Sequence, residues 1–430
     1  MDAQIIIVGA GAAGLMAGIA AGRAGSQVLI LDQKEKPGKK LYATGNGRCN
    51  YTNLRQERDC YRGTDPDFAM RAFQSFGLER TRRLFGELGI LERSINGYLY
   101  PNSGQAKDVV AVLLYELDRL GAAIRCGEAV TQIRKEKNGF AVRTGEREYR
   151  SAKVILAAGG CASPKLGSDG SGYALAKSLG HSLIEPVPAL VQLKSAENTK
   201  AVSGVRFFGA GDIRNSTGKV LTAEEGEFLF TDYGISGIPV MQMSRFAAKE
   251  LQAGRKVRLT LNFLSDMTKE VCEKEITKRF SGRNRSATAI QALTGLVNEK
   301  LLWYVLKECG IKEEAPVQKV PRESVIRLAG LLQAYPLTIN GTNSFENAQV
   351  CAGGVKTSQV TEQMESKLCG GLYLAGELLD IDGTCGGYNL QWAWTSGWIA
   401  GSSAAEGIRG QSGGSQRSEY NMTERHEKRT

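Results

Sequence analysis

The residues of this sequence with the most evident chemical potential lie in the stretch "GNGRCNYTN", Gly45 to Asn53. The stretch combines glycines, which adopt turn conformations without steric cost, with asparagines, whose side chains can hydrogen-bond to the nearby backbone. It also holds a cation at Arg48 and a thiol at Cys49. It is too polar to fill a core and too short to be a disordered linker. We therefore expect its backbone to wrap a ligand, with Arg48 able to form a bidentate contact to an anionic group.

Cys49 has two interpretations, a redox thiol or a small packing residue. A dithiol relay needs a second cysteine to resolve the mixed disulfide, and no other cysteine lies within a few residues of Cys49. The nine cysteines of the chain form no C-x-x-C pair, and an odd number cannot complete a set of disulfides. The sequence therefore favours a packing or hydrogen-bonding role for Cys49, and reduced thiols in a cytoplasmic protein.

A glycine-rich turn near the N-terminus, Gly9 to Gly14 (GAGAAG), follows a predicted apolar strand at Ile5 to Val8 and opens a predicted helix of small residues. In the pattern G-x-G-x-x-G, the first glycine makes a tight turn and the second lets a pyrophosphate approach the backbone. The third lets the helix pack closely on its strand. Asp32 ends the next predicted strand, eighteen residues after Gly14, where its carboxylate can accept hydrogen bonds from a ribose. This arrangement predicts dinucleotide binding.

A second cofactor-facing motif lies near the C-terminus, in "GLYLAGELLDIDGTCGGYNLQWAWTSGWIAG". A predicted strand at Leu372 to Ala375 ends in Gly376-Glu377, and a Gly386-Gly387 turn opens a predicted helix from about Leu390 to Ala404. Two helix N-termini directed at one extended ligand suit FAD, because the second helix dipole can stabilise negative charge on the flavin ring. Ala152 to Gly160 is a further predicted strand whose small terminal residues would allow close approach of the cofactor.

Together with "FTDYGISG" and "AGGV", these motifs resemble the bacterial NAD(P)/FAD-dependent oxidoreductases that include aminoacetone-oxidase-like and BaiN-like (bile-acid dehydro-reductase) flavoproteins. The resemblance covers the chain up to about Gly407. It implies an α/β fold in which a discontinuous Rossmann-type FAD-binding domain carries an inserted β-barrel-like domain and a small helical module. It also implies that the Gly45 to Asn53 loop lies along the flavin. The chain departs from the family pattern at Thr384-Cys385, where an acidic or polar residue followed by Thr is expected.

The order of predicted elements agrees with this layout. Short β-rich runs between about Val187 and Phe263 precede a helical region, and "YPLTINGT" returns to strand. The candidate helices of that region are Met267 to Phe280, Ala287 to Cys309 and Glu323 to Ala334. We predict a FAD-binding domain in two parts (1–186 and 349–409), an inserted β-rich domain (187–265 and 335–348), an inserted helical module (266–334) and a disordered tail (410–430).

The predicted cofactor-binding residues come from these turns and loops and from residues beside them. They are Gly9, Gly11, Ala12, Ala13, Gly14, Asp32, Gln33, Lys40, Gly45, Asn46, Gly47, Arg48, Cys49, Asn50, Val130, Ala158, Gly159, Gly376, Glu377, Asp382, Gly387, Asn389 and Leu390. Tyr388, beside the expected ring, could donate a proton or could merely stack. The tryptophans Trp392, Trp394 and Trp398 fit a packed helix face better than a substrate cage.

Histidine content and charge limit the chemistry further. The chain has two histidines, His181 and His426, so we predict no metal site and a non-covalent FAD. Asp380 and Asp382 lack a third ligand nearby. The net charge of +10 is scattered without a run of five or six basic residues, so no nucleic-acid partner is expected. Glycines interrupt the apolar N-terminus and no basic residue precedes it, so no membrane partner is expected either.

Three functional hypotheses follow. The first is an FAD-dependent oxidoreductase of small molecules, which either reduces an activated C=C bond of a steroid-like enone or oxidises an amine with O₂. The second is an FAD-dependent RNA-modifying protein, and the third a flavin-binding sensor. Because the chain has no second G-x-G-x-x-G, NAD(P)H would dock transiently on the flavin face that the substrate also uses, giving ping-pong kinetics. The insertion from Val187 to about Thr342 would cover that face, and the oligomeric state stays open.

Overall fold

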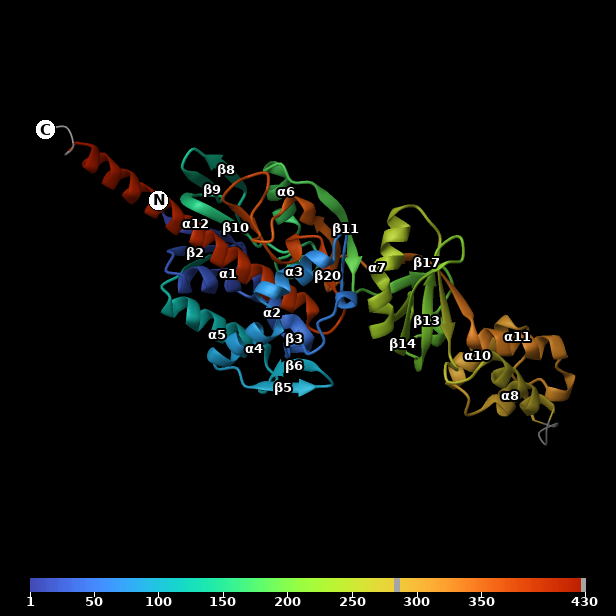
Figure 1. The fold of residues 1–430 in the computed structure, drawn as a ribbon. Helices are drawn as coiled ribbons and strands as arrows, with labels where there is room; N and C mark the ends of the chain where they lie inside the picture. The colour runs from blue at the N-terminus through green and yellow to red at the C-terminus, as the bar shows by residue number, and fades with distance from the viewer. Residues whose placement is uncertain (282–286, 427–430) are drawn as a thin grey trace. The chain divides into compact units, whose positions relative to one another are not determined.

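The computed structural model describes the backbone of residues 1–281 and 287–426 and the side chains of the same residues up to 408 (Figure 1). The chain divides into two compact units. Unit 1 comprises Met1–Pro186 and Val350–Thr430, and unit 2 comprises Val187–Gln349. The predicted disordered tail, 410–430, falls on residues whose side chains, and from 427 also the backbone, lie outside the described part.

Unit 1 is built on a seven-stranded sheet with the order β7-β2-β1-β10-β9-β8, in which β19 also pairs with β10. The strands β1, β2, β7, β10 and β19 are parallel, and β8 and β9 are antiparallel additions. The bounds are β1 Ala3–Val8, β2 Val28–Asp32, β7 Ala123–Cys126, β8 Gln132–Glu136, β9 Gly139–Arg143, β10 Glu148–Leu156 and β19 Leu372–Leu374. Residues Ile5, Ile6 and Ile7 are fully buried, because a parallel sheet is covered on both faces and its strands are continuously apolar.

The remaining elements of unit 1 surround this sheet (Figure 1). Its helices are α1 Ala12–Arg23, α2 Lys39–Ala43, α3 Asp67–Ser75, α4 Leu78–Glu87, α5 Ala106–Arg119, α6 Ser171–Ser178 and α12 Tyr388–His426. Its short strands are β3 Thr52–Asn53, β4 Tyr61–Gly63, β5 Glu92–Ile95, β6 Tyr98–Pro101, β18 Val350–Val355 and β20 Ile381–Gly383, and β11 Leu183–Ala189 runs over the unit boundary and pairs with β18. The short helix α2 lies between β2 and the Gly45 to Asn53 loop.

Unit 2 contains a closed barrel with the strand order β12-β15-β14-β13-β16-β17. The strands are β12 Leu193–Ser195, β13 Arg206–Arg214, β14 Val220–Thr231, β15 Gly234–Gly237, β16 Val257–Asn262 and β17 Tyr335–Thr342. The helices are α7 Ile238–Gln252, α8 Lys269–Ser281, α9 Ala289–Leu293, α10 Glu299–Glu308 and α11 Arg322–Gln333. Barrel and helices share one hydrophobic core. The predicted fold class, α/β with an inserted barrel and helices, is confirmed.

Two predictions about elements of unit 2 are wrong. The helix predicted from Ala287 to Cys309 is two helices, because Gly295 takes a positive φ of 87° and the Asn298 side chain accepts from the Lys300 backbone N–H to start α10. The region between Val187 and Phe263 is not only β-rich, since it includes α7, a helix of 15 residues that packs on β14.

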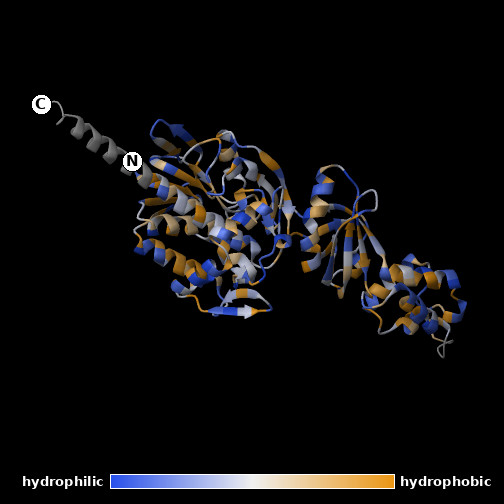
Figure 2. Ribbon diagram, in the orientation of Figure 1, coloured by the Kyte–Doolittle hydropathy of each residue, from blue (hydrophilic) through white to orange (hydrophobic). Residues whose placement is uncertain are grey.

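Figure 2 shows hydrophilic and hydrophobic residues interspersed along the helices. Among the described residues, no helix is both long enough and apolar enough to cross a membrane.

Candidate functional site

The three glycines of the N-terminal turn differ in what surrounds them. A Cβ at Gly9, whose φ is 105°, would lie 2.5 Å from the Ala157 carbonyl oxygen, and a Cβ at Gly14 would lie 1.8 Å from the Gly9 carbonyl oxygen. Packing therefore requires both. A Cβ at Gly11 would meet no atom within 4 Å. The space beside Gly11, at the N-terminus of α1, is open for a ligand, where free backbone N–H groups and the helix dipole favour an anion.

Asp32 holds this turn from the end of β2. Its carboxylate accepts a hydrogen bond from the Ala10 N–H at 2.6 Å and one from the Lys34 N–H at 2.7 Å. A carboxylate has about four acceptor positions, so others are left for hydroxyl groups of a ribose. The next residue, Gln33, donates from its side-chain amide to the Gly167 carbonyl at 2.8 Å.

The helices α1 and α12 pack in parallel at very short range. A Cβ at Gly397 would lie 2.3 Å from the Ala13 carbonyl oxygen, and one at Gly401 would lie 2.2 Å from the Ala17 carbonyl oxygen. Glycines are therefore needed where the two backbones meet. Because residue 397 of α12 lies level with residue 13 of α1, residue 396 lies level with Ala12, the first residue of α1. Helix α12 begins eight residues earlier, at Tyr388, so its N-terminus extends past that of α1 by about 12 Å at 1.5 Å per residue. Two N-termini pointing the same way with this offset suit a ligand with phosphates at one position and a ring further along.

The Gly45 to Asn50 loop has an unusual backbone. Gly45, Asn46 and Gly47 have φ values of 56°, 53° and 83°, and Cys49 has 56°. Glycine, and among the other residues asparagine, adopts this left-handed region most readily, so the residue types suit the turn that the loop makes. Arg48 is exposed and its guanidinium lies 5.5 Å from the centre of the Tyr100 ring. The loop can thus present a cation to a ligand.

This loop meets the start of α12, although about 340 residues separate them in the chain. A Cβ at Gly387 would lie 2.7 Å from the Thr52 carbonyl oxygen and 2.8 Å from Asn50 Oδ1. Asn53 donates from Nδ2 to the Gly386 carbonyl at 3.0 Å. Asn389 fixes the preceding turn, because its Oδ1 accepts from the Gly383 N–H at 2.8 Å and its Nδ2 donates to the Gly383 carbonyl at 3.0 Å. The structure therefore brings the two long motifs together.

The residues present fit an FAD molecule. Asn50 Oδ1 and Asp380 Oδ1 are buried and have no hydrogen-bond partner among the described residues. An unpaired buried acceptor costs about 1–3 kcal/mol, which a ligand N–H or O–H would remove. Together with the open space at Gly11 and the left-handed run from Gly45 to Gly47, these acceptors offer places for a ligand with both phosphate and donor groups.

The other predicted residues lie around the same elements. Lys40 Nζ forms an ion pair with Glu377 Oε2 at 2.8 Å, which joins α2 to the segment after β19. A Cβ at Gly376 would lie 2.9 Å from the Ala13 Cβ. The remaining members are partly or fully buried: Ala158 and Gly159 after β10, Val130 before β8, Asp382 in β20 and Leu390 in the first turn of α12. Asn53, which lies in the stretch singled out from the sequence, and Tyr100, which lies in no predicted motif, also contact the site.

Cys49 and Tyr388 are both buried. Cys49 is fully enclosed, and burial raises the pKa of its thiol to about 11, so the thiol is neutral at pH 7. The Tyr388 ring lies edge-on to Tyr61 at 5.8 Å. Burial, followed by a hydrogen bond with Cys60, raises the pKa of the Tyr388 hydroxyl, which therefore keeps its proton. A proton-donating role for Tyr388 stays a prediction.

The tryptophans of α12 contribute to packing. Trp392 and Trp394 are buried, and their indole N–H groups donate to the Gly376 and Tyr51 carbonyls at 3.0 and 2.9 Å. These bonds hold the segment after β19 and the end of the Gly45 to Asn53 loop on the helix.

Comparison with protein families identifies the family. The model of the HI0933-like protein Rossmann domain matches residues 3–403 of this chain. The chain belongs to the HI0933-like family. This is a family of FAD-dependent oxidoreductases, and the chain is an enzyme of that kind. The sequence had suggested the same family, and this prediction is confirmed.

Three characterised proteins resemble the chain over most of its length. A 3-dehydro-bile acid delta(4,6)-reductase of Clostridium scindens is 44% identical over 408 residues, which cover 94% of this chain and 99% of the reductase. Ribosomal RNA dihydrouridine synthases of Escherichia coli and Haemophilus influenzae are 30% and 32% identical, with 91% of this chain and 96% of each relative covered.

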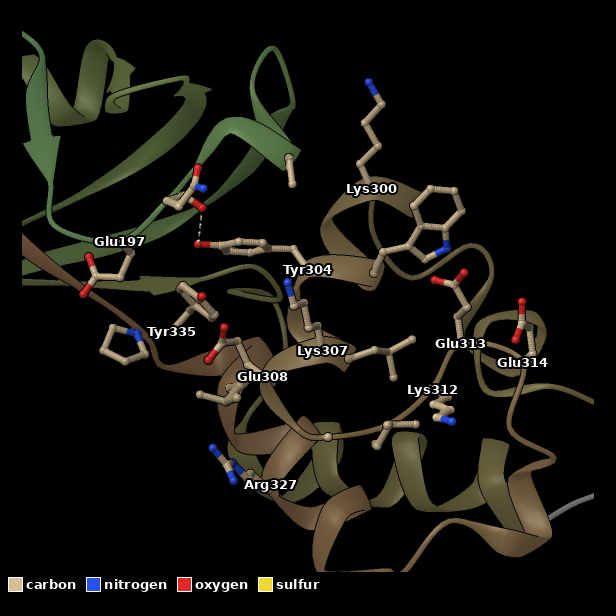
Figure 3. Close-up of a pocket in the computed structure, with 18 residues that line it drawn as sticks. Glu197, Lys300, Tyr304, Lys307, Glu308, Lys312, Glu313, Glu314, Arg327 and Tyr335 are labelled. Carbon is tan, nitrogen blue, oxygen red and sulfur yellow. Dashed lines mark hydrogen bonds between the residues drawn. The ribbon is translucent and has the colours of Figure 1, made fainter.

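This HI0933-like protein also has an open pocket of about 990 Å³ in unit 2, lined by α10, the segment that follows it, α11 and residues around Glu197 (Figure 3). Four carboxylates, of Glu197, Glu308, Glu313 and Glu314, line it with four cations, of Lys300, Lys307, Lys312 and Arg327. The Tyr304 hydroxyl donates to the Asn198 carbonyl at 3.3 Å. No predicted cofactor residue lines the pocket, and its charges balance, so it has no evident preference for an anion.

Proposed function

We propose that this enzyme reduces an activated C=C bond of a small enone, of steroid or bile-acid type, with NAD(P)H as the hydride donor. The observation that carries the proposal is the 44% identity to the Clostridium scindens reductase over 99% of that protein. The match extends over both long motifs. Their close contact in unit 1 supports the view that a common cofactor site is retained.

The chain's own residues would divide the work of binding FAD, which supplies hydride transfer when bound. The N–H groups beside Gly11 would bind the pyrophosphate, and Asp32 would accept from the adenosine ribose. The left-handed Gly45 to Gly47 run and the N-terminus of α12, from Tyr388, would lie along the ribityl chain and ring. There the helix dipole would favour negative charge.

Reduction of an enone also needs a proton at the carbon next to the carbonyl. Tyr388 is our candidate source, because it begins α12 directly after the Gly386-Gly387 turn and its hydroxyl carries a proton at neutral pH. Because Tyr388 is buried beside Tyr61, water that restores its proton after each turnover would have to enter through the substrate site. Tyr388→Phe should therefore lower turnover while FAD affinity stays unchanged. If turnover is unchanged, the proton comes from water or another group.

The sequence has one dinucleotide fingerprint, so NAD(P)H and the acceptor would use one face in turn. Steady-state kinetics with NADH or NADPH and an enone should then give parallel double-reciprocal lines, with inhibition by each substrate at high concentration. Intersecting lines would indicate a separate nicotinamide site. The nine free cysteines suit the reducing cytoplasm in which we place the enzyme.

The deciding experiment mixes the purified yellow protein anaerobically with NADH, NADPH, a 3-oxo-4-ene steroid and a small amine, and follows the flavin absorbance. We expect a nicotinamide to bleach the flavin and the enone to restore it. If an amine bleaches it and neither nicotinamide does, the enzyme is an amine oxidase that uses O₂.

RNA reduction is a second candidate, favoured by the two dihydrouridine synthases at 30% and 32% identity. A ribosomal RNA substrate would require a basic surface. The balanced charges of the unit 2 pocket do not supply one there, although the chain as a whole carries a net charge of +10. Incubation of reduced enzyme with unmodified ribosomal RNA, followed by measurement of dihydrouridine, tests this candidate. Dihydrouridine formation without any reduction of enones would overturn our first choice.

A further inference from the structure

Two cysteines that lie 190 residues apart in the chain meet in unit 1. Cys161 follows β10 in the segment after Gly159, and Cys351 is the second residue of β18. Their sulfur atoms are 3.4 Å apart, and the Cys161 backbone N–H donates to the Cys351 sulfur at 3.1 Å. A disulfide needs its sulfurs at about 2.05 Å, so a shift of roughly 1.4 Å would join them.

The two thiols differ in exposure. Cys161 is partly exposed, whereas Cys351 is 4% exposed. The surroundings are tight on the Cys351 side, because a Cβ at Gly160 would lie 3.1 Å from the Cys351 sulfur and 3.0 Å from the Tyr173 hydroxyl. An oxidant in solution can therefore reach Cys161, while Cys351 is held behind it.

The two thiols also differ in acidity. A hydrogen bond from Cys351 and the positive charge of Lys40 lower the pKa of Cys161, against opposing effects of burial and of the Glu185 carboxylate. The same contact with Cys161, together with burial, raises the pKa of Cys351. The accessible sulfur is thus the nucleophile, and the enclosed one keeps its proton. This is the arrangement of an attacking and a resolving thiol.

We propose that Cys161 and Cys351 form a peroxide-sensitive dithiol that closes reversibly to an intramolecular disulfide. In the first step the Cys161 thiolate attacks one oxygen of hydrogen peroxide, the O–O bond breaks, and the departing hydroxide takes a proton to become water. Cys161 is then a sulfenic acid. In the second step the Cys351 sulfur attacks the Cys161 sulfur, the S–O bond breaks, and the Cys351 proton leaves with the hydroxide as a second water.

The balance is two thiols and one peroxide to one disulfide and two waters, with two electrons passing from sulfur to oxygen. A dithiol reductant reverses the change by thiol–disulfide exchange. The site lies beside predicted cofactor residues, since Gly159 precedes Cys161 by two positions and Lys40 is paired with Glu377.

The test treats the full chain, with its flavin, with a small excess of hydrogen peroxide. Free thiols are then blocked with N-ethylmaleimide, disulfides are reduced, and the newly freed thiols are labelled with heavy N-ethylmaleimide for mass spectrometry. We expect equal heavy label on Cys161 and Cys351. In a digest that is not reduced, the peptides that carry them should be joined, with a mass two hydrogens below the sum of the separate peptides. Cys369, a partly exposed cysteine of the same unit, is the internal control and should carry on the order of tenfold less label.

Variants separate the two roles. Cys351→Ser should leave Cys161 as a sulfenic acid that dimedone traps, and Cys161→Ser should leave Cys351 unoxidised. Cys369→Ser should behave as wild type. The wild-type labelling alone still decides the question if a variant does not fold. The proposal is overturned if Cys161 of the wild-type protein stops at the sulfenic acid with Cys351 still a thiol, or if heavy label is no greater on the pair than on Cys369.

Discussion

Exchange of single glycines in the N-terminal turn should separate binding from folding. Gly11→Ala adds a methyl group where no atom lies within 4 Å, on a residue with φ of −81° that alanine adopts freely. Loss of unfolded-state entropy favours alanine by about 0.4–1 kcal/mol, and its poorer N-cap propensity costs a similar amount. The free energy of unfolding of the flavin-free protein should therefore change by less than about 1 kcal/mol.

FAD binding should respond quite differently. The new methyl group would occupy the space through which the pyrophosphate approaches the backbone N–H groups of α1. A hydrogen bond to a charged group contributes about 1.5–3 kcal/mol. Loss of one such bond raises the Kd for FAD by roughly ten- to a hundredfold. Titration of flavin-free protein with FAD, followed by flavin fluorescence, measures this change.

Gly14→Ala is the contrasting variant. Its methyl carbon would lie 1.8 Å from the Gly9 carbonyl oxygen, so β1 and α1 must move apart. Overpacking of this kind costs about 1–3 kcal/mol or more, and urea unfolding of the flavin-free protein should show it. Gly86→Ala is the matched control, because Gly86 is exposed in α4 with no atom within 4 Å of its added Cβ. Wild-type FAD affinity in a stable Gly11→Ala protein would refute our placement of the pyrophosphate.

Further predictions concern Asp32 and Cys49. Asp32→Ala should weaken FAD binding by about 1–3 kcal/mol, and it also removes the hydrogen bond from the Ala10 N–H that holds the turn. Unchanged FAD affinity in a titration would place the ribose elsewhere. Cys49→Ser should keep FAD and its reduction by substrate, whereas loss of turnover with flavin bound would make the thiol essential. The unfolded Cys49 thiol ionises near pH 9 and the folded one near 11, so stability present below pH 9 is lost as the pH rises to 11. The free energy of unfolding, measured with urea, should therefore fall by about 2–3 kcal/mol less in Cys49→Ala than in wild type between pH 9 and pH 11.

The parts of the fold that the sequence predicts well are those with local signals. The apolar run before Gly9, the glycine turn and Asp32 lie within one βαβ unit, so spacing alone places them. The helix α7 was missed although it carries a signal, since Pro239 lies in its first turn, where proline is common. Its position between β-rich runs outweighed that signal.

Contacts between distant segments had no local signal. The family resemblance implied that the Gly45 to Asn53 loop lies along the flavin, but its contact with the start of α12 was not predicted, and periodicity could not have supplied it. The Cys161 and Cys351 pair was not expected at all, because neither residue lies in a motif and 190 residues separate them. Such pairs depend on the order of strands in the sheet, which a single sequence does not specify.

The distribution of backbone strain points to the same site as the motifs. Cys49 and Asn46 are non-glycine residues with positive φ, a conformation that costs an L-residue about 1–2 kcal/mol. Tertiary contacts hold this shape: the Cys49 N–H donates to the Thr44 carbonyl at 3.0 Å, and the Tyr51 N–H to the Leu99 carbonyl at 3.0 Å. Strain that surrounding contacts maintain is commonly found where a ligand needs a preformed surface. Because the strained loop carries the unpaired Asn50 oxygen and lies against the Gly386-Gly387 turn, we propose that its conformation serves cofactor binding.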